Sequence, residues 1–300
     1  MTAGLSLLLA SVAKAADPTE LVFVFQKQKE PDALRDQSEK LSAELSKRLG
    51  MPVRAVVPQD YAASVQALAS GKADVAYVSS LPFLLARRDA GAKLLLVEER
   101  PDAKGVFRTD YDSVFVSRTD STITDFRAIR DNPKNIRMCF TSRTSTSGFV
   151  FPALRLLNEK LLTSGQDPKD IFKEVSFAGS YSLALRQVLD GRSDVAAVSD
   201  YTVEGPGATS YVSADELKQL RVVSRTPGVP THLICVRPGL SEALQSRIKQ
   251  ALLDVSRQSP EMLNDVYGTS RFVEADEDKH VQSAIDAVNA VGLPLENLAR

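Results

Sequence analysis

The chain contains an internal repeat at a constant spacing of 120 residues. Residues 60–80, DYAASVQALASGKADVAYVSS, align without a gap with residues 180–200, SYSLALRQVLDGRSDVAAVSD. In each copy, apolar residues at helical spacing are followed by a glycine, a basic residue and an aspartate two positions further on, and then a short run rich in valine and alanine. This pattern predicts a helix with a glycine close to its C-terminal cap, and then a buried strand.

Two copies are too few for a solenoid, which needs several stacked repeats. We therefore expect two similar α/β lobes that use the same helix–strand unit in the same place. The length of 300 residues is sufficient for two medium-sized domains. The hydrophobic content of 43% and the charged content of 25% are typical of a soluble globular protein. A net charge of −1 argues against a nucleic acid partner, which would require a basic face.

Strands alternate with helices along the chain, from LVFVF at 21–25 onward, and this alternation predicts mostly parallel sheets. The segment YDSVFVSRTDS, residues 111–121, predicts a longer strand that leaves the first lobe, and segments 220–226 and 231–239 predict the return crossing. We expect one lobe from residues 17–115 plus 231–300 and the other from residues 116–230. The two connecting strands would form a hinge that closes around a ligand.

Residues 1–16 have the pattern of a signal peptide. The apolar run 5–12 is followed by Ala13-Lys14-Ala15, which resembles a cleavage site, although no basic residue precedes the run. A frayed terminus or a buried first helix is the alternative. Export would allow Cys139 and Cys235 to pair, but we expect them on strands of different lobes as buried free thiols.

The segment SRTSTSGF, residues 142–149, lies between a predicted strand at 136–141 and a predicted helix that begins near residue 149. Ser145, Thr146 and Ser147 carry hydroxyl groups, and Gly148 permits close approach of the backbone to a ligand. At a helix N-terminus, these donors and the helix dipole favour a bound anion. An ordinary N-cap needs only one such residue, so the residues alone leave both interpretations open.

The segment CFTSRTSTSGFVFPALRLL, with the later KEVSFAGSYSLALRQVLDGRSDVAAV, resembles the phosphonate/phosphite-binding family of periplasmic substrate-binding proteins of ABC importers. Residues 60–80 and GVFRTDYDSVFVSR also match the family's pattern. The resemblance covers nearly the whole mature chain. It implies an α/β, two-lobed periplasmic binding protein fold of type II with a two-strand hinge. It also implies a tetrahedral phosphorus oxyanion between the lobes.

The resemblance further implies which residues bind the ligand. Tyr181 stands where the family commonly has histidine, and Asp200 matches a position that is acidic in aminophosphonate binders. His232 stands where such proteins tend to carry aspartate, which weakens the case for an amine-bearing ligand. The implied ligand-binding residues are Tyr61, Tyr111, Ser145, Thr146, Ser147, Tyr181 and Asp200, with Ser80 and His232 as further candidates.

The predicted function is that of a monomeric, periplasmic solute-binding protein that delivers its ligand to an ABC permease in the inner membrane. Phosphite and methylphosphonate rank first as ligands, phosphate next and 2-aminoethylphosphonate last. No cofactor or metal is expected. A sensor subunit for a membrane receptor and a binding protein for another small oxyanion are the alternatives. An enzyme is disfavoured, since the chain has two histidines, His232 and His280, and no Walker A, GxGxxG, HExxH or GxSxG motif. We expect His280, in the charged stretch DEDKH, at the surface.

Overall fold

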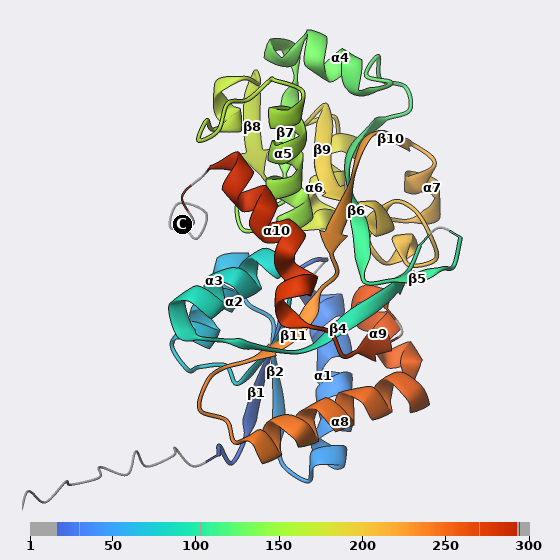
Figure 1. Ribbon diagram of the computed structural model, residues 1–300. Helices are drawn as coiled ribbons and strands as arrows, with labels where there is room; N and C mark the ends of the chain where they lie inside the picture. The colour runs from blue at the N-terminus through green and yellow to red at the C-terminus, as the bar shows by residue number, and fades with distance from the viewer. Residues whose placement is uncertain (1–16, 30, 103, 270, 293, 295–300) are drawn as a thin grey trace, which may run out of the picture.

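The computed structural model describes residues 17–29, 31–102, 104–269, 271–292 and 294. The predicted signal peptide, residues 1–16, lies outside the described residues. The described chain forms two α/β lobes stacked one above the other (Figure 1). The predicted two-lobed fold class is confirmed.

The first lobe, at the bottom of Figure 1, is built on a seven-stranded sheet of the described residues, in the order β12-β4-β11-β3-β1-β2, with β5 paired to β4. Its strands are β1 (Leu21–Phe25), β2 (Val53–Val56), β3 (Val75–Val78), β4 (Lys93–Pro101), β5 (Phe107–Arg108), β11 (Leu233–Val236) and β12 (Arg271–Val273). Its helices are α1 (Pro31–Leu49), α2 (Tyr61–Ala69), α3 (Ser80–Ala90), α8 (Glu242–Gln258) and α9 (Pro260–Tyr267). One core, which includes Leu41, Leu252 and Tyr77, packs α1, α8 and α9 against this sheet.

The second lobe has a five-stranded sheet in the order β10-β6-β9-β7-β8. Its strands are β6 (Asp110–Arg118), β7 (Arg137–Phe140), β8 (Glu174–Phe177), β9 (Val195–Ser199) and β10 (Leu220–Pro230). Its α-helices are α4 (Phe126–Asp131), α5 (Phe151–Asn158), α6 (Tyr181–Leu189) and α7 (Ala214–Leu217). Shorter helical turns are η1 (Pro133–Asn135), η2 (Thr146–Val150), η3 (Pro168–Asp170), η4 (Asp200–Thr202) and η5 (Ala208–Ser210). The core of this lobe continues into α2 and α3 of the first lobe.

The sheets are mixed, and the prediction of mostly parallel sheets is wrong. β1 pairs in parallel with β2 and β3, and β7 pairs in parallel with β8 and β9. However, β11 lies between β3 and β4 and is antiparallel to both. In the second lobe, β6 is antiparallel to β9, and β10 is antiparallel to β6. Alternation along the chain indicates only the local β-α-β units, and each lobe also accepts a strand that arrives from the other lobe.

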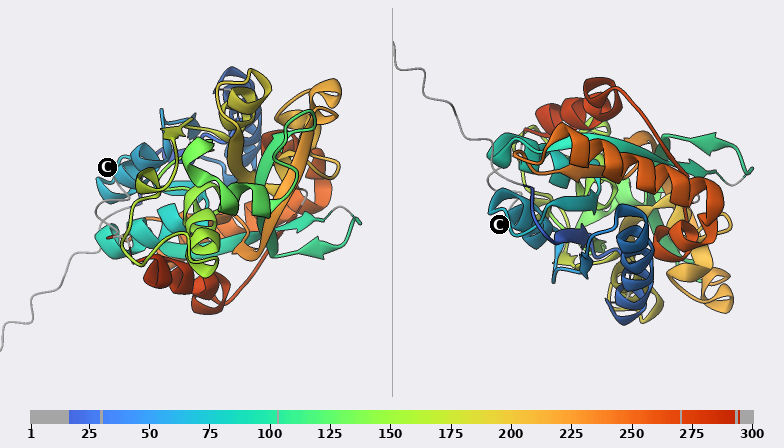
Figure 2. Two further views of the ribbon diagram at one scale, coloured as in Figure 1. Left: turned by 90° about the horizontal axis from the view of Figure 1, so that it is seen from above. Right: turned by 90° about the horizontal axis from the view of Figure 1, so that it is seen from below.

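Two adjacent segments connect the lobes. β6 carries the chain into the second lobe, and β10 pairs with it in antiparallel register through Tyr111↔Val229 and Asp110↔Pro230 on the way back. The amide of Thr231 donates to the carbonyl of Thr109 at 3.0 Å, which extends this pairing to the point where the chain re-enters the first lobe. Helix α10 (Glu277–Val291) then runs beside both lobes, against α3 in one and α5 in the other (Figures 1 and 2).

The sequence repeat corresponds to the same structural unit in each lobe. Tyr61 and Tyr181 are the first residues of α2 and α6, which are nine residues long. Oδ2 of Asp74 accepts a hydrogen bond from the Val22 amide in β1 at 2.9 Å. Oδ2 of Asp194 accepts from the Arg137 amide in β7 at 2.8 Å. Each aspartate therefore fixes the start of its strand against the neighbouring parallel strand.

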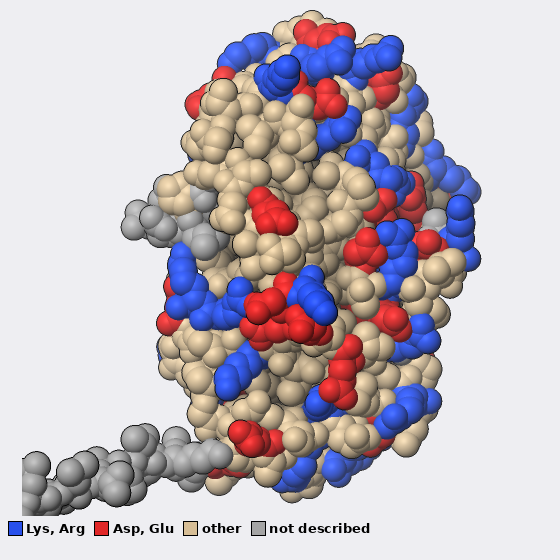
Figure 3. Space-filling model, viewed as in Figure 1, with Lys and Arg blue, Asp and Glu red and all other residues tan. Residues whose placement is uncertain are grey.

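Cys139 in β7 and Cys235 in β11 are buried free thiols in different lobes, as predicted. In the part of the chain that the structure describes, no helix combines the length and the apolar character needed to cross a membrane. On the face shown in Figure 3, acidic and basic side chains are interspersed. That face therefore offers no extended basic surface of the kind that nucleic acid binding requires.

We predict that Asp194→Asn lowers the free energy of unfolding by about 1–2 kcal/mol at pH 7. Partial burial acts to raise the pKa of Asp194, but hydrogen bonds from the Arg137 side chain and amide outweigh it, and the pKa is lowered. Stability from a lowered pKa is present above the pKa of the unfolded state, about 3.9, and is lost as the pH falls through the folded-state pKa. The difference between wild type and variant in urea denaturation should therefore shrink below about pH 4.

Asp190→Asn provides the matched control, because Asp190 is an exposed partner of Arg192 in the same lobe. It should change stability by less than about 0.5 kcal/mol. A stability difference for Asp194→Asn that is equally large at pH 7 and pH 3 would contradict the assigned role of the carboxylate.

Candidate functional site

The predicted hydroxyl-rich motif forms a tight turn at the junction of the lobes. Ser145 precedes η2, a turn of π-helix over Thr146–Val150 that continues into α5, and its Oγ accepts a hydrogen bond from the Gly148 amide at 3.0 Å. A Cβ atom on Gly148 would lie 2.4 Å from Oγ1 of Thr141 and 2.7 Å from Oγ of Ser145. Only glycine fits here, so this residue permits the close approach of β7 and the turn.

Ser147 is the centre of a buried cluster of hydroxyl groups. Its Oγ lies 2.8 Å from the phenol oxygen of Tyr181 in α6, and it accepts a hydrogen bond from the phenol of Tyr111 in β6 at 3.2 Å. The carbonyl of Ser147 accepts from Oγ of Ser113 at 2.7 Å, which fixes the turn against β6. Three of the predicted site residues are therefore in direct contact.

Tyr61 approaches the same cluster from the first lobe. Burial, together with the nearby phenols of Tyr181 and Tyr111, raises the pKa of Tyr61 well above its usual range. The phenol is therefore a neutral donor at every physiological pH. Its oxygen is fully buried and forms no hydrogen bond of acceptable geometry, although the side chains of Tyr181 and Gln26 lie close enough to influence its pKa. A buried donor without a partner is costly, and in native proteins such a group usually has a partner such as a ligand or an ordered water.

Two hydrogen bonds cross between the lobes beside this cluster. Oγ1 of Thr146 accepts from the Leu81 amide at the start of α3, at 2.9 Å. The amide of Tyr181, at the start of α6, donates to the carbonyl of Gln28 at 3.0 Å. The lobes are therefore closed on each other at this site.

Further unpartnered polar atoms are buried in this region. Both ring nitrogens of His232 lack a hydrogen bond, although Nδ1 lies 3.4 Å from Oε1 of Glu98. Burial is the main influence on the pKa of His232 and lowers it, so the ring is neutral at pH 7. Buried atoms without a partner also include Nε2 of Gln28, Oγ of Ser182 and Oγ of Ser199. This concentration of free hydrogen-bonding capacity suits a small polar ligand more than a packing interface.

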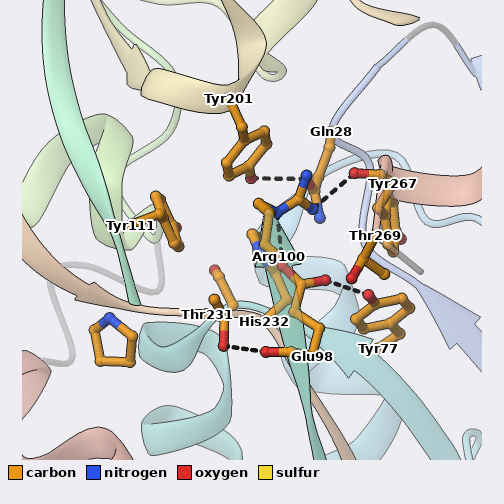
Figure 4. Close-up of polar contacts among 12 residues, drawn as sticks. Gln28, Tyr77, Glu98, Arg100, Tyr111, Tyr201, Thr231, His232, Tyr267 and Thr269 are labelled. Atoms are coloured by element: carbon orange, nitrogen blue, oxygen red, sulfur yellow. Dashed lines mark hydrogen bonds and ion pairs between the residues drawn. The ribbon is translucent and has the colours of Figure 1, made fainter. Parts of the chain in front are cut away.

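A buried charged cluster lies next to His232, and the sequence analysis missed it (Figure 4). Nε of Arg100 donates to Oε1 of Glu98 at 3.1 Å, and both side chains are almost fully buried, with 3% and 0% exposed. The Tyr77 phenol donates to the other oxygen of Glu98. Burial acts to raise the pKa of Glu98, but Arg100, His232 and Tyr77 lower it to about 2.

Within the described ranges, Asp200 forms no hydrogen bond or ion pair with the hydroxyl cluster and lies instead against Tyr201 and Arg225. It begins η4, where its Oδ1 accepts from the Tyr201 amide at 2.8 Å, and its Oδ2 lies 3.5 Å from Arg225. It lines a cavity of about 420 Å³. That cavity is lined also by Arg100, Pro101, Asp102, Lys104, Arg108, Asp110, Tyr111, Asp112, Tyr201, Glu204 and Arg225.

Ser80, a further candidate, has a structural contact, and so do two residues that were not candidates, Arg143 and His280. Oγ of Ser80, in α3, lies 3.4 Å from the carbonyl of Pro230, at the return crossing. Arg143 is half-buried and pairs with Asp167 at 2.6 Å. His280 is half-buried, and its Nε2 lies 3.0 Å from the carbonyl of Thr231. The prediction that His280 is a surface residue is therefore wrong, because α10 packs along the crossing strands. Among the described residues, no group of three histidine, cysteine or acidic side chains could hold a metal ion.

A family model described as "ABC transporter, phosphonate, periplasmic substrate-binding protein" matches residues 23–280. The phosphonates-binding periplasmic protein of Escherichia coli is 24% identical over 73% of the chain. The phosphate-import protein PhnD of Mycolicibacterium smegmatis is 24% identical over 68% of the chain. The chain covers 61% and 62% of the lengths of these two relatives.

The fold also matches solved structures. PhnD1 from Prochlorococcus marinus, in complex with methylphosphonate, superposes with a TM-score of 0.75. The match covers 91% of the chain and 98% of that structure, at 21% sequence identity. At this level of identity, the match establishes the two-lobed fold alone.

We predict that Asp200→Asn stabilises the protein at high pH. Burial, followed by the neighbouring carboxylate of Asp112, raises the pKa of Asp200 to about 6. A raised carboxyl pKa means that the folded state loses stability as the pH rises from about 4 to above 6. The variant should therefore exceed wild type by about 1–3 kcal/mol in free energy of unfolding at pH 8, and by little at pH 4. Urea denaturation at the two pH values measures this.

Asp110→Asn removes another carboxylate from the same cavity, one that is paired with Arg108 at 2.7 Å. It should show no comparable gain at pH 8. Equal stability of wild type and Asp200→Asn at both pH values would refute the raised pKa.

Proposed function

The chain belongs to the family of periplasmic phosphonate-binding proteins of ABC transporters, and from this membership we propose that it captures a small phosphorus oxyanion between its lobes. The ligand lies against the hydroxyl cluster of Tyr61, Tyr111, Ser147 and Tyr181. Ser145 and Thr146 complete the set through the turn that begins α5. The protein acts by binding, without a chemical step.

The unpartnered phenol of Tyr61 is the observation that carries this proposal. It is a buried neutral donor, and it comes from the lobe opposite the Ser147 turn. A tetrahedral oxyanion presents several acceptor oxygens in different directions, so it can accept from donors on both lobes at once. Each hydrogen bond to a charged acceptor contributes about 1.5–3 kcal/mol. Arginine and lysine are not needed in direct contact, because the helix starts of α2 and α6 add favourable dipoles.

Phosphite and methylphosphonate fit the surroundings of this cluster better than phosphate does. Either ligand has one substituent, hydrogen or methyl, that needs no hydrogen-bond partner. Phosphate has a fourth oxygen in that place, and an aromatic wall such as the ring of Tyr111 would leave that oxygen unpaired. The PhnD1 structure with methylphosphonate supports the same ligand class for this chain.

Delivery to an ABC permease is the proposed purpose of binding, and a periplasmic location follows from it. The names of the relatives support this assignment, since both describe periplasmic or import functions. The hinge formed by β6 and β10 provides the opening that release to a permease requires.

Isothermal titration of the refolded, ligand-free protein tests the proposal. We predict tight binding of phosphite or methylphosphonate, with weaker binding of phosphate and no binding of sulfate. Tyr61→Phe and Ser147→Ala should each lower the affinity for the preferred ligand by about 10-fold to 100-fold, which corresponds to about 1.5–3 kcal/mol.

Ser193→Ala is the control, because Ser193 is a buried serine in the second lobe whose Oγ donates to Gln187, towards the end of α6 opposite to Tyr181. It should leave the affinity unchanged. Absence of heat with every phosphorus oxyanion, at a protein concentration well above the expected Kd, would exclude the proposed ligand class.

A further inference from the structure

We propose that His232 couples ligand binding to a proton. In the complex, the imidazole ring and the oxyanion hold one proton between them. The site therefore accepts a monoanion directly and takes up a proton from solvent when it binds a dianion. This inference rests on the proposed function and identifies the protonation state of the ligand within it.

His232 is a buried polar side chain whose hydrogen-bonding capacity is unused. The side chain is 0% exposed, and neither Nδ1 nor Nε2 forms a hydrogen bond of acceptable geometry with the described residues. Bulk water does not reach the ring, so the partner that such a group usually has must be enclosed between the lobes. The ring lies parallel to that of Tyr111 within 12°, with centroids 6.0 Å apart, and the Tyr111 phenol contacts Ser147. The imidazole therefore flanks the hydroxyl cluster on which the ligand is proposed to lie.

Glu98 determines what the imidazole can offer to that ligand. Nδ1 of His232 lies 3.4 Å from Oε1 of Glu98, close enough for the carboxylate to favour a proton on that nitrogen (Figure 4). Glu98 is ionised, because burial acts to raise its pKa but Arg100, His232 and Tyr77 lower it to about 2. A neutral imidazole has one N–H and one bare nitrogen. With the N–H toward Glu98, Nε2 is left as an acceptor.

A neutral ring cannot satisfy Glu98 and a fully deprotonated ligand at the same time. A bare Nε2 and an ionised ligand oxygen are both acceptors, and the opposite tautomer would turn the lone pair of Nδ1 toward the carboxylate. One additional proton, on the ligand oxygen or on Nε2, produces a charge-assisted hydrogen bond. It also removes one negative charge from a buried site whose other free groups, such as the Tyr61 phenol and Nε2 of Gln28, are neutral.

The other ionisable groups that face His232 keep one charge state near neutral pH. They are Tyr77 in β3, Glu98 and Arg100 in β4, Tyr111 in β6, Tyr201 in η4, Tyr267 in α9 and His280 in α10. Burial raises the pKa of the four phenols well above their usual range. Burial lowers the pKa of His280, whereas Glu98 raises that of Arg100 against the effect of burial. The additional proton therefore resides on His232 or on the ligand.

Calorimetry in two buffers of different ionisation enthalpy counts the protons that are bound together with the ligand. The probe is phosphite or methylphosphonate, whichever binds more tightly to the wild-type protein. Well above the second pKa of the ligand, we expect an uptake close to one proton per site, and well below it an uptake close to zero. Above that pKa, the affinity should fall about 10-fold for each pH unit, as linkage to one proton requires.

Two failures of this experiment are distinguishable. Binding of the dianion without proton uptake would overturn this inference alone. No binding of phosphite or methylphosphonate at either pH would instead overturn the proposed function.

His232→Phe then tests whether this ring is responsible. Phenylalanine suits the aromatic surroundings and leaves no buried polar atom, so the variant should unfold cooperatively. We expect it to bind the ligand at least 10-fold more weakly and to lose the proton uptake. Burial lowers the pKa of Lys29 to about 8 and raises that of Asp200 to about 6. Both residues are retained in the variant, so the difference in uptake between the two proteins is due to His232.

His280→Gln is the matched control, because the chain has two histidines and Nε2 of His280 already lies 3.0 Å from the carbonyl of Thr231. It should keep the wild-type affinity and proton uptake. An uptake in His232→Phe equal to that of wild type would refute the role of His232.

Discussion

The closed arrangement depends on backbone amides at helix starts that are completed by the opposite lobe. The first amides of a helix have no partner within it. Here the Leu81 amide in α3 donates to the side chain of Thr146, and the Tyr181 amide in α6 donates to the carbonyl of Gln28. Each lobe thus satisfies a donor that the other would leave unpaired in a buried interface. Opening at the hinge returns these amides to water, so the direct contacts alone favour closure only weakly. In the proposed function, a ligand that accepts a hydrogen bond from the Tyr61 phenol shifts the balance toward the closed state.

The buried pair of Glu98 and Arg100 has a different part in the same interface. Removing two charges from water costs several kcal/mol per ion, and the mutual attraction of the pair only partly offsets this cost. A buried ion pair of this kind therefore adds little to the stability of the fold, and its main effect is to fix the positions of the side chains that it contacts. Glu98 contacts Tyr77 and Arg100 in its own lobe, and Arg100 contacts Tyr201 in the other. The pair consequently positions an aromatic side chain beside the hydroxyl cluster with a fixed electrostatic environment.

The sequence predicted the local units well and the long-range arrangement less well. The repeat indicated two lobes, and it placed Tyr61 and Tyr181 at equivalent helix starts, because capping and periodicity are local properties. It could not show that β11 inserts between β3 and β4, since strand neighbours are chosen by tertiary packing. Glu98 and Arg100 lie near the end of an apolar strand, where the local sequence indicates ordinary surface charges, and tertiary contacts from both lobes bury them. His280 was misplaced for the same reason, because its charged neighbours gave no sign that α10 packs along the crossing strands.

In the proposed site, the separation between neutral donors and charged groups would allow an anion to be both held and released. The polar groups around Ser147 are hydroxyls. Burial raises the pKa of the Tyr61 and Tyr111 phenols, so the capacity of these two phenols to donate a hydrogen bond does not change across physiological pH. Neutral donors are effective only when several of them point at one anion in a dry environment, whereas a single arginine would attract it even in an open cleft. Because Tyr61 lies on one lobe and Ser147 on the other, the full set of donors exists only when the lobes are closed. Affinity is then a property of the closed state, and hinge opening by itself removes most of it.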